Sequence, residues 1–64
     1  LDLLIEQAIA KVGKPVALMN KDDKTAVVQY LNNAGAFLIT KSGDKVSSLL
    51  GISKFTLYSY MDKG

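Results

Sequence analysis

The sequence predicts an all-α fold, a small multi-helical domain preceded by an amphipathic linker helix. Apolar residues recur at intervals of three and four along most of the chain, which is the spacing of one face of an α-helix. Gly13, Gly35 and Gly51 stand where these patterns stop, and only one run, residues 37–40, favours a β-strand. With 64 residues the chain forms one domain, whose single core is marginally stable on its own.

The composition excludes several kinds of site. The chain has no cysteine and no histidine, so we expect no disulfide, no metal and no other cofactor. No run approaches the roughly 18 apolar residues of a membrane span, and no segment resembles a signal peptide. We therefore expect a cytoplasmic protein without membrane association. Because Leu1 already lies within a helical pattern, we also expect a fragment of a longer chain.

Positive charge is concentrated in the second half of the chain. Eight lysines and no arginine stand against six acidic residues, which gives a net charge of +2. Residues 1–34 are balanced, whereas residues 35–64 hold four lysines and two aspartates. This excess is a weak electrostatic sign of nucleic-acid binding, and ordinary solubilising surface charge is the alternative.

The first helix is predicted to end at residue 13. Its apolar residues form one stripe, and Gly13 and Pro15 stop it; the stripe consists of Leu1, Leu4, Ile5, Ala8, Ile9 and Val12. Two uses of this stripe remain open: packing on the rest of the domain, or pairing with a second copy or with an upstream part of the longer chain. We expect residues 1–13 to be a linker or dimerisation helix and residues 14–64 to be a separate domain.

A second helix is predicted after an apolar connector, residues 14–19. Asn20 is placed as its N-cap, with Asp23 reaching back as in a capping box. Gly35 is the expected C-terminal residue with positive φ. The buried face is assigned to Val27, Val28 and Leu31.

The link to a third helix is predicted to be an apolar turn that inserts Phe37 and Ile39 into the core, with a short extended bridge as the alternative. Ser42 is the expected N-cap of the third helix. Its apolar residues are Val46, Leu49 and Leu50, and it ends at Gly51.

A fourth helix follows closely enough to predict a helix-turn-helix. Only Ile52 and Ser53 separate Gly51 from the next helical pattern, so the two helices must cross steeply. Ser53 is the expected N-cap, with Thr56 at the third helical position, and Ile52 faces Leu57 as a hydrophobic staple.

The last helix has two contrasting faces. On a helical wheel the inner face consists of Leu57, Tyr60 and Met61, and the outer face of Lys54, Phe55, Tyr58, Ser59 and Asp62. Cationic, hydroxyl and aromatic groups at a helix N-terminus are typical of a recognition helix that enters the DNA major groove. We therefore expect residues 54–62 to be such a helix. The alternative is a protein-interaction or dimerisation module that uses Phe55 and Tyr58.

Residues 19–61 resemble the C-terminal helix-turn-helix domain of the YheO-like (DauR-like) bacterial transcriptional regulators. The most specific pieces are MNKDDK, GAFLITKSGDKV and LLGISKFTLYSYM. The resemblance implies a sequence-specific regulator of double-stranded DNA that is a homodimer or higher homo-oligomer. It also implies an upstream PAS-like sensor domain, through which alone a small-molecule effector would act. Ser47 departs from the alanine that is usual at the close contact between the two helices.

The candidate DNA-binding residues are Lys41, Ser42, Ser53, Lys54, Phe55, Thr56, Tyr58, Ser59 and Lys63. Without arginine, base readout must come from lysine, serine and aromatic side chains, including apolar contacts to thymine methyl groups. Lys45 is expected to add non-specific attraction. No catalytic residue is predicted, because the serines lack a base and no glycine-rich phosphate loop is present.

Overall fold

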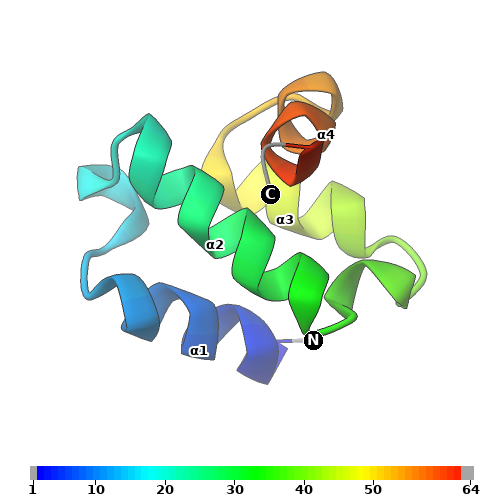
Figure 1. Cartoon of the computed structure of the whole chain (residues 1–64), viewed down its shortest axis with the longest axis horizontal. Helices are drawn as coiled ribbons and strands as arrows, with labels where there is room; N and C mark the ends of the chain where they lie inside the picture. Colours follow the sequence, from blue (N-terminus) through cyan, green and yellow to red (C-terminus); the bar gives the residue numbers. More distant parts are fainter. Residues whose placement is uncertain (1, 63–64) are drawn as a thin grey trace.

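The computed structural model describes residues 2–62, which contain four α-helices, two short 3₁₀-helices and no β-strand. In Figure 1, α2 occupies the centre, with α1 packed against one side and α4 against the other, while α3 packs against α4. The all-α prediction is confirmed. The elements are α1 (Asp2–Val12), η1 (Val16–Leu18), α2 (Lys21–Asn33), η2 (Ala36–Leu38), α3 (Ser42–Leu50) and α4 (Lys54–Asp62).

Helix α1 packs on α2 within the chain, and the described part of its predicted apolar stripe is buried or partly buried there, while Leu1 lies outside the described residues. Ile5 and Ala8 are buried, and the ammonium of Lys11 lies 5.2 Å from the centroid of the Tyr30 ring on α2. An ion pair between Lys45 and Asp2 joins α3 to the start of α1. No helix in residues 2–62 has both the length and the apolar character needed to cross a membrane.

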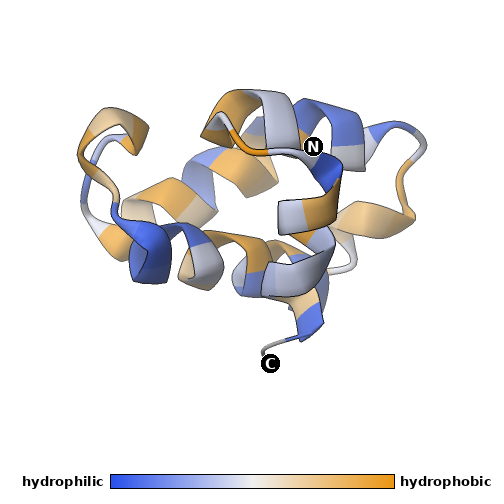
Figure 2. Cartoon of the chain, turned by 90° about the horizontal axis from the view of Figure 1, so that it is seen from above, coloured by the Kyte–Doolittle hydropathy of each residue, from blue (hydrophilic) through white to orange (hydrophobic). Residues whose placement is uncertain are grey.

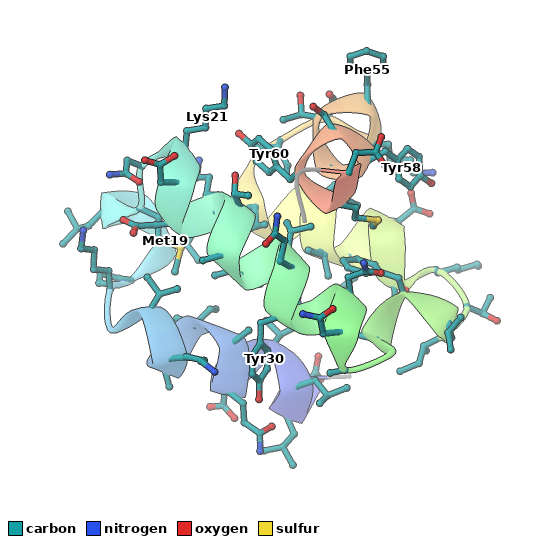
Figure 3. All side chains as sticks on the ribbon, viewed as in Figure 1. Met19, Lys21, Tyr30, Phe55, Tyr58 and Tyr60 are labelled. Atoms are coloured by element: carbon teal, nitrogen blue, oxygen red, sulfur yellow. The ribbon has the colours of Figure 1, made fainter. Side chains whose placement is uncertain are left out.

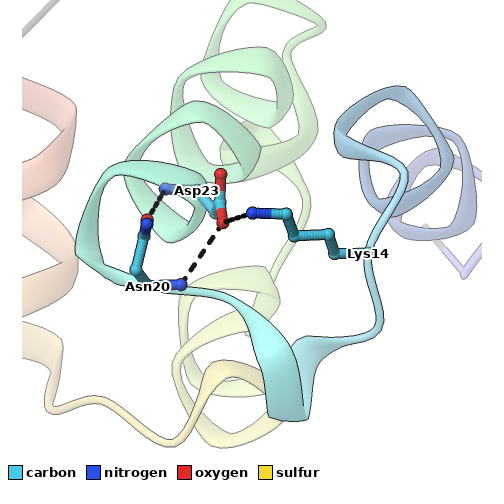
Figure 4. Close-up of polar contacts among 3 residues, drawn as sticks. All are labelled: Lys14, Asn20 and Asp23. Atoms are coloured by element: carbon cyan, nitrogen blue, oxygen red, sulfur yellow. Dashed lines mark hydrogen bonds and ion pairs between the residues drawn. The ribbon is translucent and has the colours of Figure 1, made fainter.

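The start of α2 is fixed by the predicted capping box (Figure 4). The Asn20 side chain accepts a hydrogen bond from the backbone N–H of Asp23 at 2.8 Å, and the Asp23 carboxylate accepts one from the backbone N–H of Asn20 at 3.3 Å. Lys14 adds an ion pair to the same carboxylate at 3.0 Å. This pairing with Lys14, together with the Asn20 N–H, lowers the pKa of Asp23 below its ordinary value.

The predicted buried face and end of α2 are also confirmed. Val27, Val28 and Leu31 are at most 1 % exposed. Gly35 has a φ of 79°, in the left-handed region that favours glycine, and it turns the chain from α2 into η2.

The link after Gly35 differs from the prediction. Ala36 is fully buried, Phe37 is partly buried against the core, and Ile39 is 44 % exposed. The reason is that Ala36–Leu38 forms a 3₁₀ turn, in which successive side chains lie about 120° apart. Ala36 therefore points inward and Leu38 outward. Ile39 has already left the turn in an extended conformation, so it does not follow Ala36 into the core, and the extended bridge does not form.

The start of α3 is a second correction. Lys41, with a φ of 64°, occupies the N-cap position, and no side chain caps the helix there. Ser42 is the first helical residue because the carbonyl of Lys41 accepts the first i→i−4 bond of α3, from the N–H of Lys45 at 3.2 Å. The Ser42 side chain is 1 % exposed, and its hydroxyl oxygen has no hydrogen-bond partner among the described residues.

The buried face of α3 includes Ser47, which is predicted to lie at the contact between the two helices, but not Leu49, which is predicted among the apolar residues of this helix. Val46 and Leu50 are buried as predicted, but Leu49 is 44 % exposed and Ser47 is buried. Val46, Ser47 and Leu50 follow the i, i+1, i+4 spacing of one helix face, and Leu49 falls at its margin.

One hydrophobic core joins all four α-helices. Hydrophilic and hydrophobic residues alternate along the helices in Figure 2, as expected for amphipathic helices around a shared core. The largest fully buried apolar side chains are Leu31, Leu50, Leu57, Val27, Val28 and Val46.

Candidate nucleic-acid interface

The turn between α3 and α4 is a tight reversal centred on Gly51. Its φ is 67°, its N–H bonds to the carbonyl of Ser48 at 3.2 Å, and the N–H of Ile52 bonds to the carbonyl of Ser47 at 3.0 Å. This pair of bonds is the Schellman arrangement, which satisfies the last carbonyls of a helix and requires a left-handed residue. The predicted role of Gly51 is confirmed.

Serine at the close contact between α3 and α4 is accommodated without an unpaired polar group. Ser47 is 6 % exposed, and its hydroxyl donates to the carbonyl of Asp44 at 3.1 Å. Since this bond lies within α3, Ser47 presents only a small side chain to α4.

The predicted N-cap of α4 is present. The Ser53 hydroxyl oxygen accepts a hydrogen bond from the backbone N–H of Thr56 at 3.1 Å and donates its proton to the Thr56 hydroxyl at 3.0 Å. Ile52 and Leu57 both belong to the packed core, in keeping with the predicted staple. The proton of Ser53 is thereby used within the chain, and the hydroxyl proton of Thr56 is left for an outside acceptor.

The two faces of α4 are as the sequence predicts. Leu57 is fully buried, Tyr60 is 7 % exposed, and Met61 packs against the core. The Gln29 side-chain amide on α2 donates to the Tyr60 carbonyl at 3.3 Å, so the end of α4 is tied to the central helix. The outer residues are all exposed, namely Lys54, Phe55, Tyr58, Ser59 and Asp62. Figure 3 shows Phe55 pointing away from the molecule.

Lys54 forms an ion pair with Asp44 of α3, which the sequence does not predict. The hydrogen bond and the charge of the Asp44 carboxylate raise the pKa of Lys54 above its ordinary value, and both side chains remain about half exposed. The two residues stand ten positions apart on different helices, so no helical spacing reveals the pair.

The other candidate residues are distributed unevenly. Lys41 is exposed and lines a shallow groove with Lys54 and Tyr58, so these three side chains lie on one face of the molecule. Ser42 is buried and does not present its hydroxyl to solvent. Lys45, expected to add attraction for DNA, is paired with Asp2. Lys63 lies outside the described residues.

Comparison with known proteins agrees with this geometry. A family model described as an HTH domain matches residues 1–62, which includes α1 as well as the helix-turn-helix. No curated protein and no solved structure gave a significant match. The match spans nearly the whole sequence, and the structure contains two helices joined by a tight glycine turn. This chain therefore belongs to a family of DNA-binding helix-turn-helix domains.

Proposed function

We propose that this chain is the sequence-specific DNA-binding domain of a bacterial transcriptional regulator, with α4 as the recognition helix in the major groove. The observation that carries the proposal is the outer face of α4. It presents a cation, hydroxyl groups and two aromatic rings to solvent, while the opposite face of the same helix is locked into the core. A rigidly held helix with exposed polar and apolar groups near its N-terminus is suited to reading base edges.

The contacts to the DNA backbone follow from the charges around α4. Lys41 and Lys54 flank the groove beside the start of α3, and the Thr56 hydroxyl has a proton to donate. The cations available to phosphates are those of Lys41, Lys54 and Lys63, with Lys45 as the fourth, and each phosphate that they neutralise releases counterions. The uncharged Thr56 hydroxyl adds only a hydrogen bond. With three or four phosphates neutralised per copy, the slope of log affinity against log salt is roughly −3 to −4.

Two copies of the chain would provide the specificity that one small interface lacks. Half-sites one helical turn apart are separated by about 34 Å, and the longest dimension of the described chain is 27 Å. Two copies therefore fit side by side on one face of the duplex. In this proposal the regulator is a homodimer or higher homo-oligomer of the YheO-like type, and an effector acts only through an upstream sensor domain.

The exposed aromatic side chains favour one alternative. Phe55 is 84 % exposed and Tyr58 is 55 % exposed, and aromatic side chains of this kind also anchor protein–protein interfaces. In that case the outer face of α4 would bind a protein partner, and Lys54 would contribute little.

Fluorescence anisotropy with a labelled random duplex distinguishes the DNA-binding proposal from the protein-interaction alternative. We expect binding that weakens steeply with salt and that is strongly reduced in Lys54→Gln. Glutamine is preferred to glutamate because a second acid beside Asp44 would repel α3. The matched control is Lys11→Gln, which also removes one positive charge. Lys11 is on α1, and α1 and α4 lie on opposite sides of the central helix α2. Thermal melting verifies that both variants are folded.

Two results would contradict the proposal. One is a folded chain that fails to bind duplex DNA at low salt. The other is an equal loss of affinity in both lysine variants, since this would mean that only total charge matters and that α4 has no special role.

A further inference from the structure

Phe55 is the least explained side chain of α4. Its ring is 84 % exposed, whereas Leu57, two residues later, is fully buried. The fold does not need the ring, because the core side of α4 is already supplied by Leu57, Tyr60 and Met61. Removing a phenyl ring from water lowers the free energy of the system. The exposed position of Phe55 therefore points to a binding partner whose surface covers the ring.

The surroundings of the ring favour DNA as that surface. Phe55 is the second residue of α4 and lies in its first turn, where the helix dipole is positive. Lys54 precedes it, and the hydroxyl groups of Ser53 and Thr56 stand on either side in the sequence. An apolar ring among a cation and hydroxyl groups complements a major groove, where apolar thymine methyl groups lie between rows of phosphates.

The second aromatic residue occupies a different place. Tyr58 is 55 % exposed and lines the groove beside Lys41 and Lys54, near the start of α3. In Figure 3 the rings of Phe55 and Tyr58 point in different directions from α4. Because Tyr58 lines this groove together with two lysines and carries a hydroxyl group, it is suited to a phosphate, and Phe55 is left as the apolar contact.

We propose that Phe55 reads the 5-methyl group of a thymine in each half-site, an inference that rests on the proposed role of α4 as recognition helix. A phenyl ring has no hydrogen-bonding group, so among the four bases the thymine methyl is the apolar feature that it can recognise. The chain also has no arginine, the side chain that most often selects guanine. Discrimination at this position therefore depends on one methyl group.

The test replaces single thymines by deoxyuridine, which removes the methyl group and keeps every hydrogen-bonding group. Duplexes that bind the 64-residue chain are first selected from a random pool, and each thymine of the selected sequence is then exchanged in turn. We expect one position at which the exchange weakens binding by about fourfold. This is the change in dissociation constant that corresponds to the free energy of burying roughly one methyl group. In Phe55→Ala the thymine and deoxyuridine duplexes should bind equally.

Tyr58→Phe is the matched control. It keeps the ring and removes the hydroxyl, so affinity should fall equally for both duplexes while the preference for thymine remains. Circular dichroism melting confirms folding, which Phe55→Ala should not disturb because the ring is exposed.

The outcomes are distinguishable. If duplex binding is salt-dependent but no thymine exchange has an effect, the inference fails and the proposed function stands. A methyl preference that persists in Phe55→Ala also overturns the inference, because another residue then reads the methyl group. If the chain binds no duplex, the proposed function fails as well.

Discussion

In the candidate interface the carboxylate of Asp44 competes with DNA for the ammonium group of Lys54. The ammonium that would approach a phosphate or a base edge is already bound by a carboxylate on the neighbouring helix. Because both side chains are about half exposed, the pair is screened by solvent and contributes little to stability. Its main effect is on the electrostatic field at the start of α4.

Replacing Asp44 by asparagine should therefore strengthen binding to duplex DNA. The change releases Lys54 and removes a negative charge that repels phosphates, and we expect the affinity at low salt to rise about two- to fivefold. Anisotropy titrations measure the effect. Glu6→Gln on α1 removes the same charge farther from α4 and should produce a smaller rise; equal rises in the two variants would contradict a specific role for the pair.

The carboxylate of Asp23 should make folding stability depend on acid pH. Its pKa is lowered from the ordinary value of 3.8 by the hydrogen bond from Lys14 and by the backbone N–H of Asn20. A carboxyl group with a lowered pKa stabilises the folded state above its unfolded pKa, and this contribution is lost as the pH falls below about 4. The melting temperature should therefore drop between about pH 5 and pH 2.

Two variants identify the source of that pH dependence. Asp23→Asn removes the titrating group, and Lys14→Gln removes its charged partner, so each should reduce the drop in melting temperature. If Lys14→Gln keeps the full wild-type drop, the ion pair in Figure 4 is not its cause.

At the scale of the elements, the helix-turn-helix depends on one backbone conformation. Gly51 has a φ of 67°, and a Cβ atom added there would meet no atom within 4 Å. Gly51→Ala should therefore act through backbone strain alone, and we expect the free energy of unfolding to fall by about 1–2 kcal/mol. Urea denaturation followed by circular dichroism measures this change.

Gly43 provides the matched control for Gly51. It lies inside α3 without a positive φ, and an added Cβ would approach a methyl carbon of Leu57 at 3.7 Å, which is ordinary contact. Gly43→Ala should therefore stabilise the chain by about 0.5 kcal/mol, because alanine has the higher helix propensity. Similar losses in both variants would mean that the alanine side chain, and not the turn conformation, is responsible.

At the scale of the whole molecule, α1 is expected to support the core. Ile5 is 5 % exposed against α2, whereas Leu3 on the same helix is 65 % exposed. Ile5→Ala should lower the free energy of unfolding by about 2–4 kcal/mol, a large share of the stability of a domain of this size. Leu3→Ala should change it by less than about 0.5 kcal/mol.

Urea denaturation of these two variants tests whether α1 belongs to the folded domain. An unchanged midpoint in Ile5→Ala would mean that α1 does not contribute to the core and acts only as a linker. Denaturation at several protein concentrations adds a second readout, because a dimer contact through α1 would make the midpoint rise with concentration.

The sequence by itself determined the helices and most of their ends. The cap at Asn20, the cap at Ser53 and the glycine at Gly51 are present as predicted. So are the two faces of α4. These features depend on residues within four or five positions of one another, where steric and hydrogen-bonding rules act without help from the rest of the fold.

Only the tertiary structure decided the features that involve residues distant in sequence. It placed α1 on α2, joined Lys54 to Asp44, and turned Lys45 toward Asp2. It also buried Ser42, which local rules assigned to a cap. The physical reason is that these outcomes depend on how the helices approach one another, and that approach is set by the packing of the shared core.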